Sequence, residues 1–314
     1  MRQTSRRSAL ALLGATALTS CATPQIVSRD TPDPFEGGIG GTGIVGLLTD
    51  FGSLIVNGLR IELTGQTQIF DTFGQVSESA LAPGQSLTIY AIRDRDAIVA
   101  RRVDINHALI GTLDGGANGP SVNGVPLEIE PNAPVRLTSG QRIAVSGLWA
   151  TDRLIVSRID AARDGPDVVA GTLVEVPAAT TLQIGGAMLQ GVPNGNRAGD
   201  YTIAFGTGNT SGIEVAQIKQ GRFTGASDLR QLSVEGYLEP INPNPGYRVA
   251  GLGHSFGRNL RLAPLDGQRA VYFGSYDGLF QANLGFVLPQ DYERRRSLLR
   301  MGYADGFDGQ ILRL

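Results

Sequence analysis

Internal repetition constrains the fold of this 314-residue chain more than any other feature of its sequence. A glycine inside a short apolar run recurs every 60 or 65 residues, at Gly46, Gly111, Gly171 and Gly236. A second glycine, followed by Gln or Asp, comes later in each segment, at Gly84, Gly140, Gly199 and Gly267. Marks that recur in one order at near-constant spacing predict one structural unit used four times.

A third mark ends the first three segments, 18 residues beyond the second glycine. It consists of Arg102 with Asp104, Arg158 with Asp160, and Gln217 with Lys219. Residues two apart on a strand share a face, so each arginine is predicted to lie beside its aspartate. An ion pair at the wall of the fold is one interpretation, and a repeated cation that contacts ligand is the other.

Between the marks the pattern is that of β-strands. Residues 87–91 and 142–149 alternate in the manner of half-buried strands. Val56-Asn57-Gly58 and Val122-Asn123-Gly124 carry the Asn-Gly signal of a tight hairpin, and Gly185-Gly186 holds the same place in the third segment. The sequence predicts an all-β protein of tandem small OB-like β-barrels, because closure of a short sheet removes its edges. Alternatively, neighbouring repeats share strands, since units of this size bury little core alone.

The predicted organisation has seven parts. They are a signal peptide (1–20), a lipidated Pro/Gly-rich tether (21–42), repeat one (43–106), repeat two (107–165), repeat three (166–227), a divergent repeat four (228–288), and a C-terminal helix and tail (289–314). The one short helix is expected at residues 289–300, where proline comes first, acids early and arginines late.

The N-terminus has the features of an export signal. Arg6 and Arg7 precede an apolar run over residues 9–18, which is too short to span a bilayer. The arginine pair resembles a twin-arginine motif, with Ala9 where an aromatic residue is usual. Export by the twin-arginine route and by the general secretory route therefore both stay open.

The one cysteine of the chain follows this run. Residues 18–20 and Cys21 resemble a bacterial lipobox. The resemblance implies cleavage before Cys21 and acylation of that residue, for example by palmitate, which anchors the protein to a membrane. Ala22, where an aspartate would favour retention in the inner membrane, implies sorting to the outer membrane.

One family shares the repeat marks. The glycine-rich residues 37–46 and the segment 51–58, with its Val-Asn-Gly, resemble the bacterial domain family of unknown function DUF5666. The resemblance covers residues 37–162 and weakens towards residue 221. It implies small tandem β-barrel modules on exported proteins and lipoproteins, and it implies no activity and no catalytic residues.

Composition excludes several classes of function. One cysteine and two histidines rule out Cys-rich zinc or iron–sulfur sites and a His-rich metal site. The net charge of −2 becomes more negative once the signal peptide is removed, which argues against binding of nucleic acid. Residues 38–43 fit a dinucleotide-binding string but open a predicted strand instead of a helix. We therefore expect no cofactor and no metal.

Aromatic residues gather in repeat four, where Tyr272, Phe273 and Tyr276 form the candidate ligand surface. Aromatic rings on a barrel face stack sugars or bases, but aromatic rings more often form core. His107 and His254 are the two histidines. Nucleophilic catalysis needs a hydroxyl and an orienting acid beside one of them, and the sequence has no Gly-x-Ser-x-Gly elbow.

These features predict a non-enzymatic lipoprotein of the bacterial cell envelope, anchored by lipid to the periplasmic side of the outer membrane. Its β-barrel array is expected to act as a binding or scaffolding module, with an envelope glycan or a protein as partner. The alternative is an envelope polysaccharide or peptide hydrolase with an unrecognised site. Clustered acids in a cleft favour the hydrolase, and an exposed aromatic face favours the binder.

Overall fold

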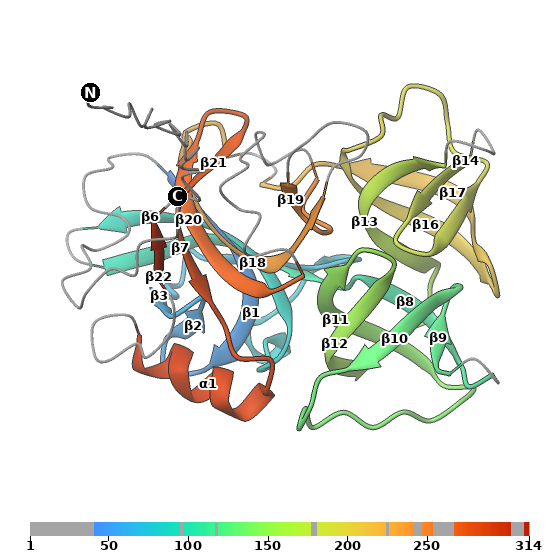
Figure 1. The fold of residues 1–314 in the computed structure, drawn as a ribbon, viewed down its shortest axis with the longest axis horizontal. Coiled ribbons are helices and arrows are strands. Elements are labelled where there is room, and N and C mark those ends of the chain that lie inside the picture. Colours follow the sequence, from blue (N-terminus) through green and yellow to red (C-terminus); the bar gives the residue numbers. More distant parts are fainter. Residues whose placement is uncertain are drawn as a thin grey trace, which may run out of the picture.

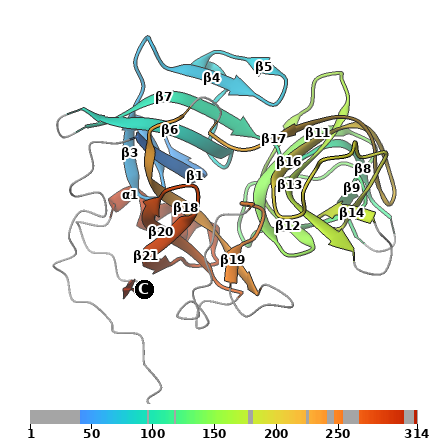
Figure 2. The same ribbon diagram turned by 90° about the horizontal axis from the view of Figure 1, so that it is seen from above.

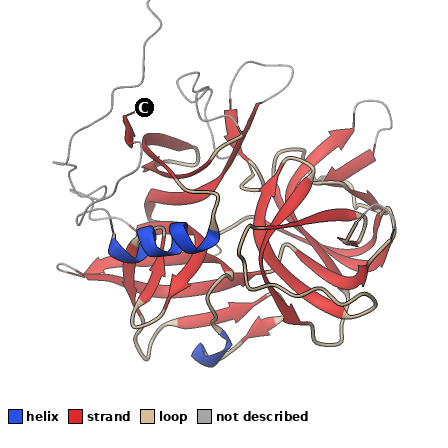
Figure 3. Ribbon diagram, turned by 60° about the horizontal axis from the view of Figure 1, so that its bottom comes forward, coloured by secondary structure: helices blue, strands red, loops and turns tan. Residues whose placement is uncertain are grey.

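The computed structural model describes residues 41–94, 97–116, 119–176, 181–223, 226–240, 247–253, 267–302 and 311–313. As the sequence predicts, these residues form an all-β structure with one α-helix (Figure 3). The strands form two sheets, of 12 and 10 strands, which lie side by side (Figure 1). Among the described helices, none is long and apolar enough to cross a membrane.

Repeat one is built on a closed circuit of strand pairs. Its elements are β1 (Gly41–Asp50), β2 (Leu54–Val56), β3 (Leu59–Glu62), β4 (Gln68–Asp71), β5 (Gly74–Gln75), the 3-10 helix η1 (Glu78–Ala80), β6 (Ser86–Asp94) and β7 (Ala97–Asn106). β1 pairs with β2, β2 with β3, β3 with β7, β7 with β6, and β6 with β1. The β3–β7 pair is parallel and the others are antiparallel. β4 pairs with β7 and β5 outside the circuit.

The same circuit recurs in repeats two and three. Repeat two contains β8 (Leu109–Asp114), β9 (Ser121–Val122), β10 (Val125–Ile129), β11 (Arg142–Ala150) and β12 (Arg153–Ala161). Repeat three contains β13 (Asp167–Val176), β14 (Thr181–Ile184), β15 (Ala187–Gln190), β16 (Tyr201–Asn209) and β17 (Gly212–Gln220). In each, the third and fifth strands pair in parallel and the fourth strand returns to the first.

Repeat four keeps part of this pattern within its described residues. It contains β18 (Leu229–Pro240), β19 (Tyr247–Val249), β20 (Arg269–Tyr276) and β21 (Phe280–Val287), and is followed by α1 (Tyr292–Met301) and β22 (Ile311–Arg313). β18 pairs with β19 and β20, and β21 pairs with β20 and β22. α1 begins later than expected because Asp291 caps it, accepting a hydrogen bond from the backbone N–H of Arg294 at 2.9 Å.

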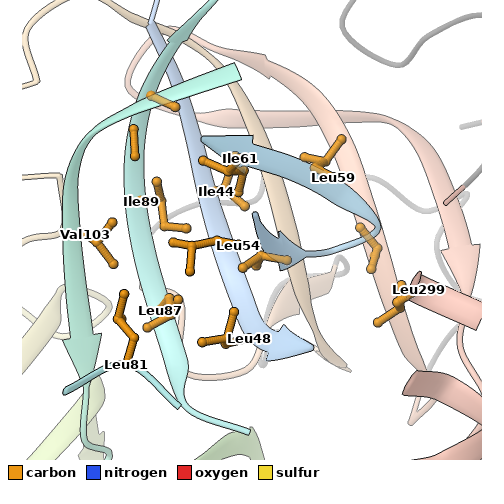
Figure 4. Packing of buried hydrophobic residues seen from close by; sticks show 14 of the residues in the cluster. Ile44, Leu48, Leu54, Leu59, Ile61, Leu81, Leu87, Ile89, Val103 and Leu299 are labelled. Atoms are coloured by element: carbon orange, nitrogen blue, oxygen red, sulfur yellow. The ribbon is translucent and has the colours of Figure 1, made fainter. Parts of the chain in front are cut away.

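Strand pairing joins the repeats two by two. β1 pairs in parallel with β18, so repeats one and four share a sheet, and β8 pairs with β13, so repeats two and three share the other (Figure 2). Their cores are shared as well. Leu299 of α1 belongs to the same cluster of buried residues as Leu48 and Leu54 of repeat one (Figure 4). The cluster also includes Phe273 of repeat four. β1 begins at Gly41, two residues inside the range 21–42 predicted for the tether.

The second glycine makes the same turn in all four repeats. Its N–H donates to the carbonyl of the leucine two residues after the first glycine: Gly84 to Leu48, Gly140 to Leu113, Gly199 to Leu173 and Gly267 to Leu238, at 2.7, 2.8, 2.6 and 3.3 Å. Each of these glycines has a positive φ, between 69° and 97°. Glycine adopts that conformation without steric cost, which explains why the mark recurs.

The first glycine leaves room for the asparagine of the hairpin. Asn57 donates from Nδ2 to the carbonyl of Val45 at 3.0 Å, and a Cβ on Gly46 would lie 1.9 Å from Asn57 Oδ1. Asn123 bonds the carbonyl of Ile110 in the same way at 3.0 Å. The first glycine of a repeat and the asparagine of its hairpin are therefore the two partners of one contact.

In repeat three the equivalent contact comes from another repeat. Gly185 stands where the first two repeats have asparagine, and Trp149 of repeat two fills the space. Its Nε1 donates to the carbonyl of Ala170, just before Gly171, at 2.9 Å. Repeats two and three are thereby joined through a buried indole as well as through the β8–β13 pair.

Candidate functional site

The aromatic residues proposed as a ligand surface lie largely in the core. Tyr272 is 0% exposed and Phe273 is 1% exposed. The ring of Phe273 packs edge-on against Phe286, with 5.6 Å between centroids. Tyr276 is half-buried at the end of β20. Tyr272 and Phe273 therefore do not present a surface to ligand, because each is buried in a hydrophobic cluster of its own.

The other predicted site residues lie outside the described part of the chain. These are Arg6 and Arg7 of the export signal and the lipidation residue Cys21. His254 also lies outside it.

The candidate site is a polar pocket where repeat three meets repeat one. Its volume is about 140 Å³. β4, β6 and β7 supply one wall, and β16, the end of β17 and the residues that follow it supply the other. His107, at the beginning of repeat two, also lines it. The pocket thus collects side chains from three repeats.

Both carboxylates of the pocket are already paired. Asp104 accepts two hydrogen bonds from Arg102 Nε, at 2.9 and 3.0 Å, and one from its Nη2 at 2.7 Å. Asp71 bonds the guanidinium of Arg163. The ion-pair interpretation of the third mark is confirmed for Arg102 and Asp104, and the Arg158–Asp160 pair has the same geometry in repeat two.

Arg222 differs, because its hydrogen-bond partners are neutral. Its guanidinium carbon lies 3.7 Å from the centroid of the Tyr201 ring. Nη1 donates to Thr88 Oγ1 at 2.7 Å and Nη2 to the carbonyl of Gly251 at 3.3 Å. Nε is buried and has no hydrogen-bond partner among the described residues. Burial lowers the pKa of this guanidinium, although Tyr201 and Asp104 oppose that effect.

Lys219 is the second cation of the pocket without a carboxylate partner in the described residues. Its Nζ lies 4.9 Å from the centroid of the Phe205 ring, and the side chain is exposed. It occupies the place that Asp104 and Asp160 hold in the first two repeats. Repeat three therefore inverts the charge at this position.

His107 is buried between the pocket and a neighbouring hollow. Its Nδ1 lies 3.0 Å from Thr72 Oγ1. Burial lowers the pKa of His107 below the usual 6.5, with Asp160 and Asp71 opposing the shift. The imidazole is therefore neutral at pH 7.

Four buried charges link the two sheets away from the pocket. Arg269 donates to Glu235 Oε1 from Nε at 2.9 Å and from Nη2 at 2.7 Å, and it also bonds Glu130. Arg295 of α1 bonds the other oxygen of Glu130. The four side chains are at most 4% exposed. Glu235 also accepts the N–H of Leu47 at 2.9 Å, so the cluster joins repeats one, two and four with α1.

The described residues contain no group of three or more His, Cys, Asp or Glu side chains that could hold a metal ion. Sequence reasoning missed Arg222, because its partners come from Thr88 and Gly251, far away in the chain. A signal for Lys219 was present, since a lysine replaces the repeated aspartate of the third mark.

Residues 42–104 match the family model of DUF5666, a domain of unknown function. The match covers the strand circuit of repeat one and confirms the resemblance found in the sequence for that repeat. The comparisons with curated proteins and with solved structures found no match.

Proposed function

We propose that this chain is a non-enzymatic, lipid-anchored protein of the bacterial cell envelope, and that its β-barrel array binds a ligand or partner there. The anchor is Cys21, and the place is the periplasmic side of the outer membrane. Arg6 and Arg7 serve export, and residues 21–40 form the tether to the folded body. The observation that carries the binding role is the polar pocket between repeats one and three.

Each strand circuit is proposed to be a small OB-like barrel. The pairings return to the first strand in repeats one, two and three, and one parallel pair completes each circuit. A five-stranded Greek-key barrel of this kind binds ligands on its face and loops. Shared sheets place the repeats of each pair beside one another, and the pocket lies between the two sheets, where repeat one meets repeat three.

The chemistry of the pocket supports binding better than hydrolysis. In the described structure His107 has one hydrogen-bond partner, Thr72. A nucleophilic triad needs an acid on the other ring nitrogen to orient the imidazole. The carboxylates of Asp71 and Asp104, which line the pocket, are instead each bound to an arginine and not to His107.

Incubation of the purified full-length protein with envelope glycans tests the proposal. Peptidoglycan fragments and lipopolysaccharide core oligosaccharides are added while unfolding temperature and product formation are both followed. A saturable rise in unfolding temperature without new products supports a binding module. Release of smaller saccharides or peptides at a rate proportional to protein concentration contradicts the non-enzymatic assignment and establishes the hydrolase alternative.

A further inference from the structure

We propose that the pocket between repeats one and three binds a single oxyanion group, a phosphate or a carboxylate carried by the ligand, through Arg222 and Lys219. This inference rests on the proposed binding function and specifies the chemistry that the same pocket recognises.

The charges of the pocket leave a positive excess. Asp71 and Asp104 are each neutralised by an arginine that is hydrogen-bonded to the carboxylate. Arg222 and Lys219 form no ion pair in the described part of the chain. His107 is neutral at pH 7, so it does not alter this balance. An anionic ligand neutralises the positive charges of Arg222 and Lys219, which no carboxylate of the described residues balances.

Arg222 is held in place before any ligand arrives. Stacking on Tyr201 fixes the plane of the guanidinium, and Thr88 and Gly251 fix its edge. A largely buried cation with only neutral partners is costly, and its buried Nε adds an unsatisfied donor. Charge-assisted hydrogen bonds from the remaining N–H groups to an oxyanion compensate that cost.

Lys219 adds a second charge at the rim. The aspartates at the equivalent positions of repeats one and two are each bound to their own arginine. In repeat three Gln217 and Lys219 replace that pair, so the strand presents a cation instead of a neutralised pair. The exchange occurs on a strand that lines this pocket, opposite the neutralised Arg102–Asp104 pair of repeat one.

The size of the pocket limits what enters it. A volume of about 140 Å³ is a few times the roughly 30 Å³ of one water molecule, enough for one compact polar group. Drug-sized ligands occupy pockets of about 300–1,000 Å³. Two larger hollows, of about 300 and 400 Å³, have no cation in their described linings that lacks a carboxylate partner. Neither of these two hollows therefore offers the cations that the smaller pocket offers to an oxyanion.

Calorimetric titration of the full-length protein tests this inference. Sodium phosphate and sodium succinate are titrated separately at constant ionic strength in chloride, so the two arms distinguish a phosphate from a carboxylate group. Lys219 is the chain's one lysine, so reductive methylation with ¹³C-formaldehyde gives a resonance that reports on the pocket directly. We expect saturable heat and a saturable shift of that resonance with at least one of the two anions.

Three variants distinguish binding at this pocket from non-specific attraction of anions to positive side chains. Arg222→Gln is expected to weaken binding about tenfold or more, and Lys219→Gln about threefold. Arg60→Gln removes one exposed charge on β3, away from the pocket, and is expected to leave the affinity unchanged. The side chain of Lys219 makes no hydrogen bond to any described residue, so Lys219→Gln is expected to keep the fold. It therefore still tests the inference if Arg222→Gln destabilises the protein.

Two results overturn the inference. One is a linear, non-saturating response to both anions. The other is an equal loss of affinity in Arg60→Gln and Lys219→Gln. If an envelope glycan binds the protein while neither anion does, the oxyanion inference fails and the proposed binding function stands.

Discussion

Replacement of Arg269 by methionine tests the buried charge cluster. The side chains of Arg269 and Glu235 are both 0% exposed, and Arg269 also bonds Glu130. Burial alone lowers the pKa of Arg269, but the charges of Glu235 and Glu130 raise it above its ordinary value, so the guanidinium stays charged. Arg269→Met fills a similar volume but leaves Glu235 buried without its counter-charge.

The expected loss in free energy of unfolding is about 3–5 kcal/mol, the usual cost of removing one partner from a buried ion pair. That is a large share of the roughly 5–15 kcal/mol that stabilises a folded protein. Urea unfolding at pH 7, followed by the fluorescence of the one tryptophan, Trp149, measures it. Trp149 is buried in the core of repeats two and three, so its emission reports on unfolding there.

Arg153→Met is the matched control. Arg153 pairs with Glu128, but the two side chains are 49% and 56% exposed, so the loss is expected to stay below about 1 kcal/mol. Equal losses in Arg269→Met and Arg153→Met would refute the reasoning.

Three further predictions concern the repeat marks, His107 and the anchor. Gly46→Ala places a Cβ 1.9 Å from Asn57 Oδ1 and is expected to lower the free energy of unfolding in urea by about 1–3 kcal/mol. Gly65→Ala is the control and is expected to be neutral, because a Cβ there has no atom within 4 Å. Equal effects of the two variants contradict the Gly–Asn contact. The folded state holds the pKa of His107 below 6.5, so the unfolded chain takes up the proton first. The free energy of unfolding is therefore expected to fall as pH drops below 6.5. If a His107→Asn variant loses stability equally steeply over this range, protonation of His107 is not the cause. Mass spectrometry of the N-terminus is expected to find an acylated chain that begins at Cys21. Cells that express Cys21→Ser are expected to accumulate the uncleaved precursor. An unmodified thiol at Cys21 contradicts the lipoprotein proposal.

Local features of the fold could be predicted from the sequence because they depend on near neighbours. Asn57 and Gly58 have positive φ values of 54° and 73°, as the hairpin signal requires. The second glycine, for example Gly84, adopts a turn that other residues disfavour, so its chemistry is visible without a structure. The C-terminal helix was predicted for similar reasons, and its beginning was displaced only by the cap at Asp291.

The site depended on contacts that no local pattern encodes. Alternation of apolar residues predicts that a strand has a buried face but not which element covers it. Tyr272 and Phe273 point to opposite faces of β20 and pack into two different hydrophobic clusters, so both rings form core. Arg222 gains its role from Thr88 and Gly251, which lie 134 and 29 residues away in sequence.

The sequence by itself determined the repeated strands, their turns and the single helix, because backbone conformation follows from the residues at each turn and from the period of the pattern. Only the tertiary structure decided which repeats share a sheet. β1 pairs with β18 and β8 with β13, so repeat one joins repeat four and not its neighbour repeat two. Such pairing depends on how whole surfaces fit and on buried charges such as Glu130 and Arg269 meeting across the chain, and those contacts exist only once the chain is folded.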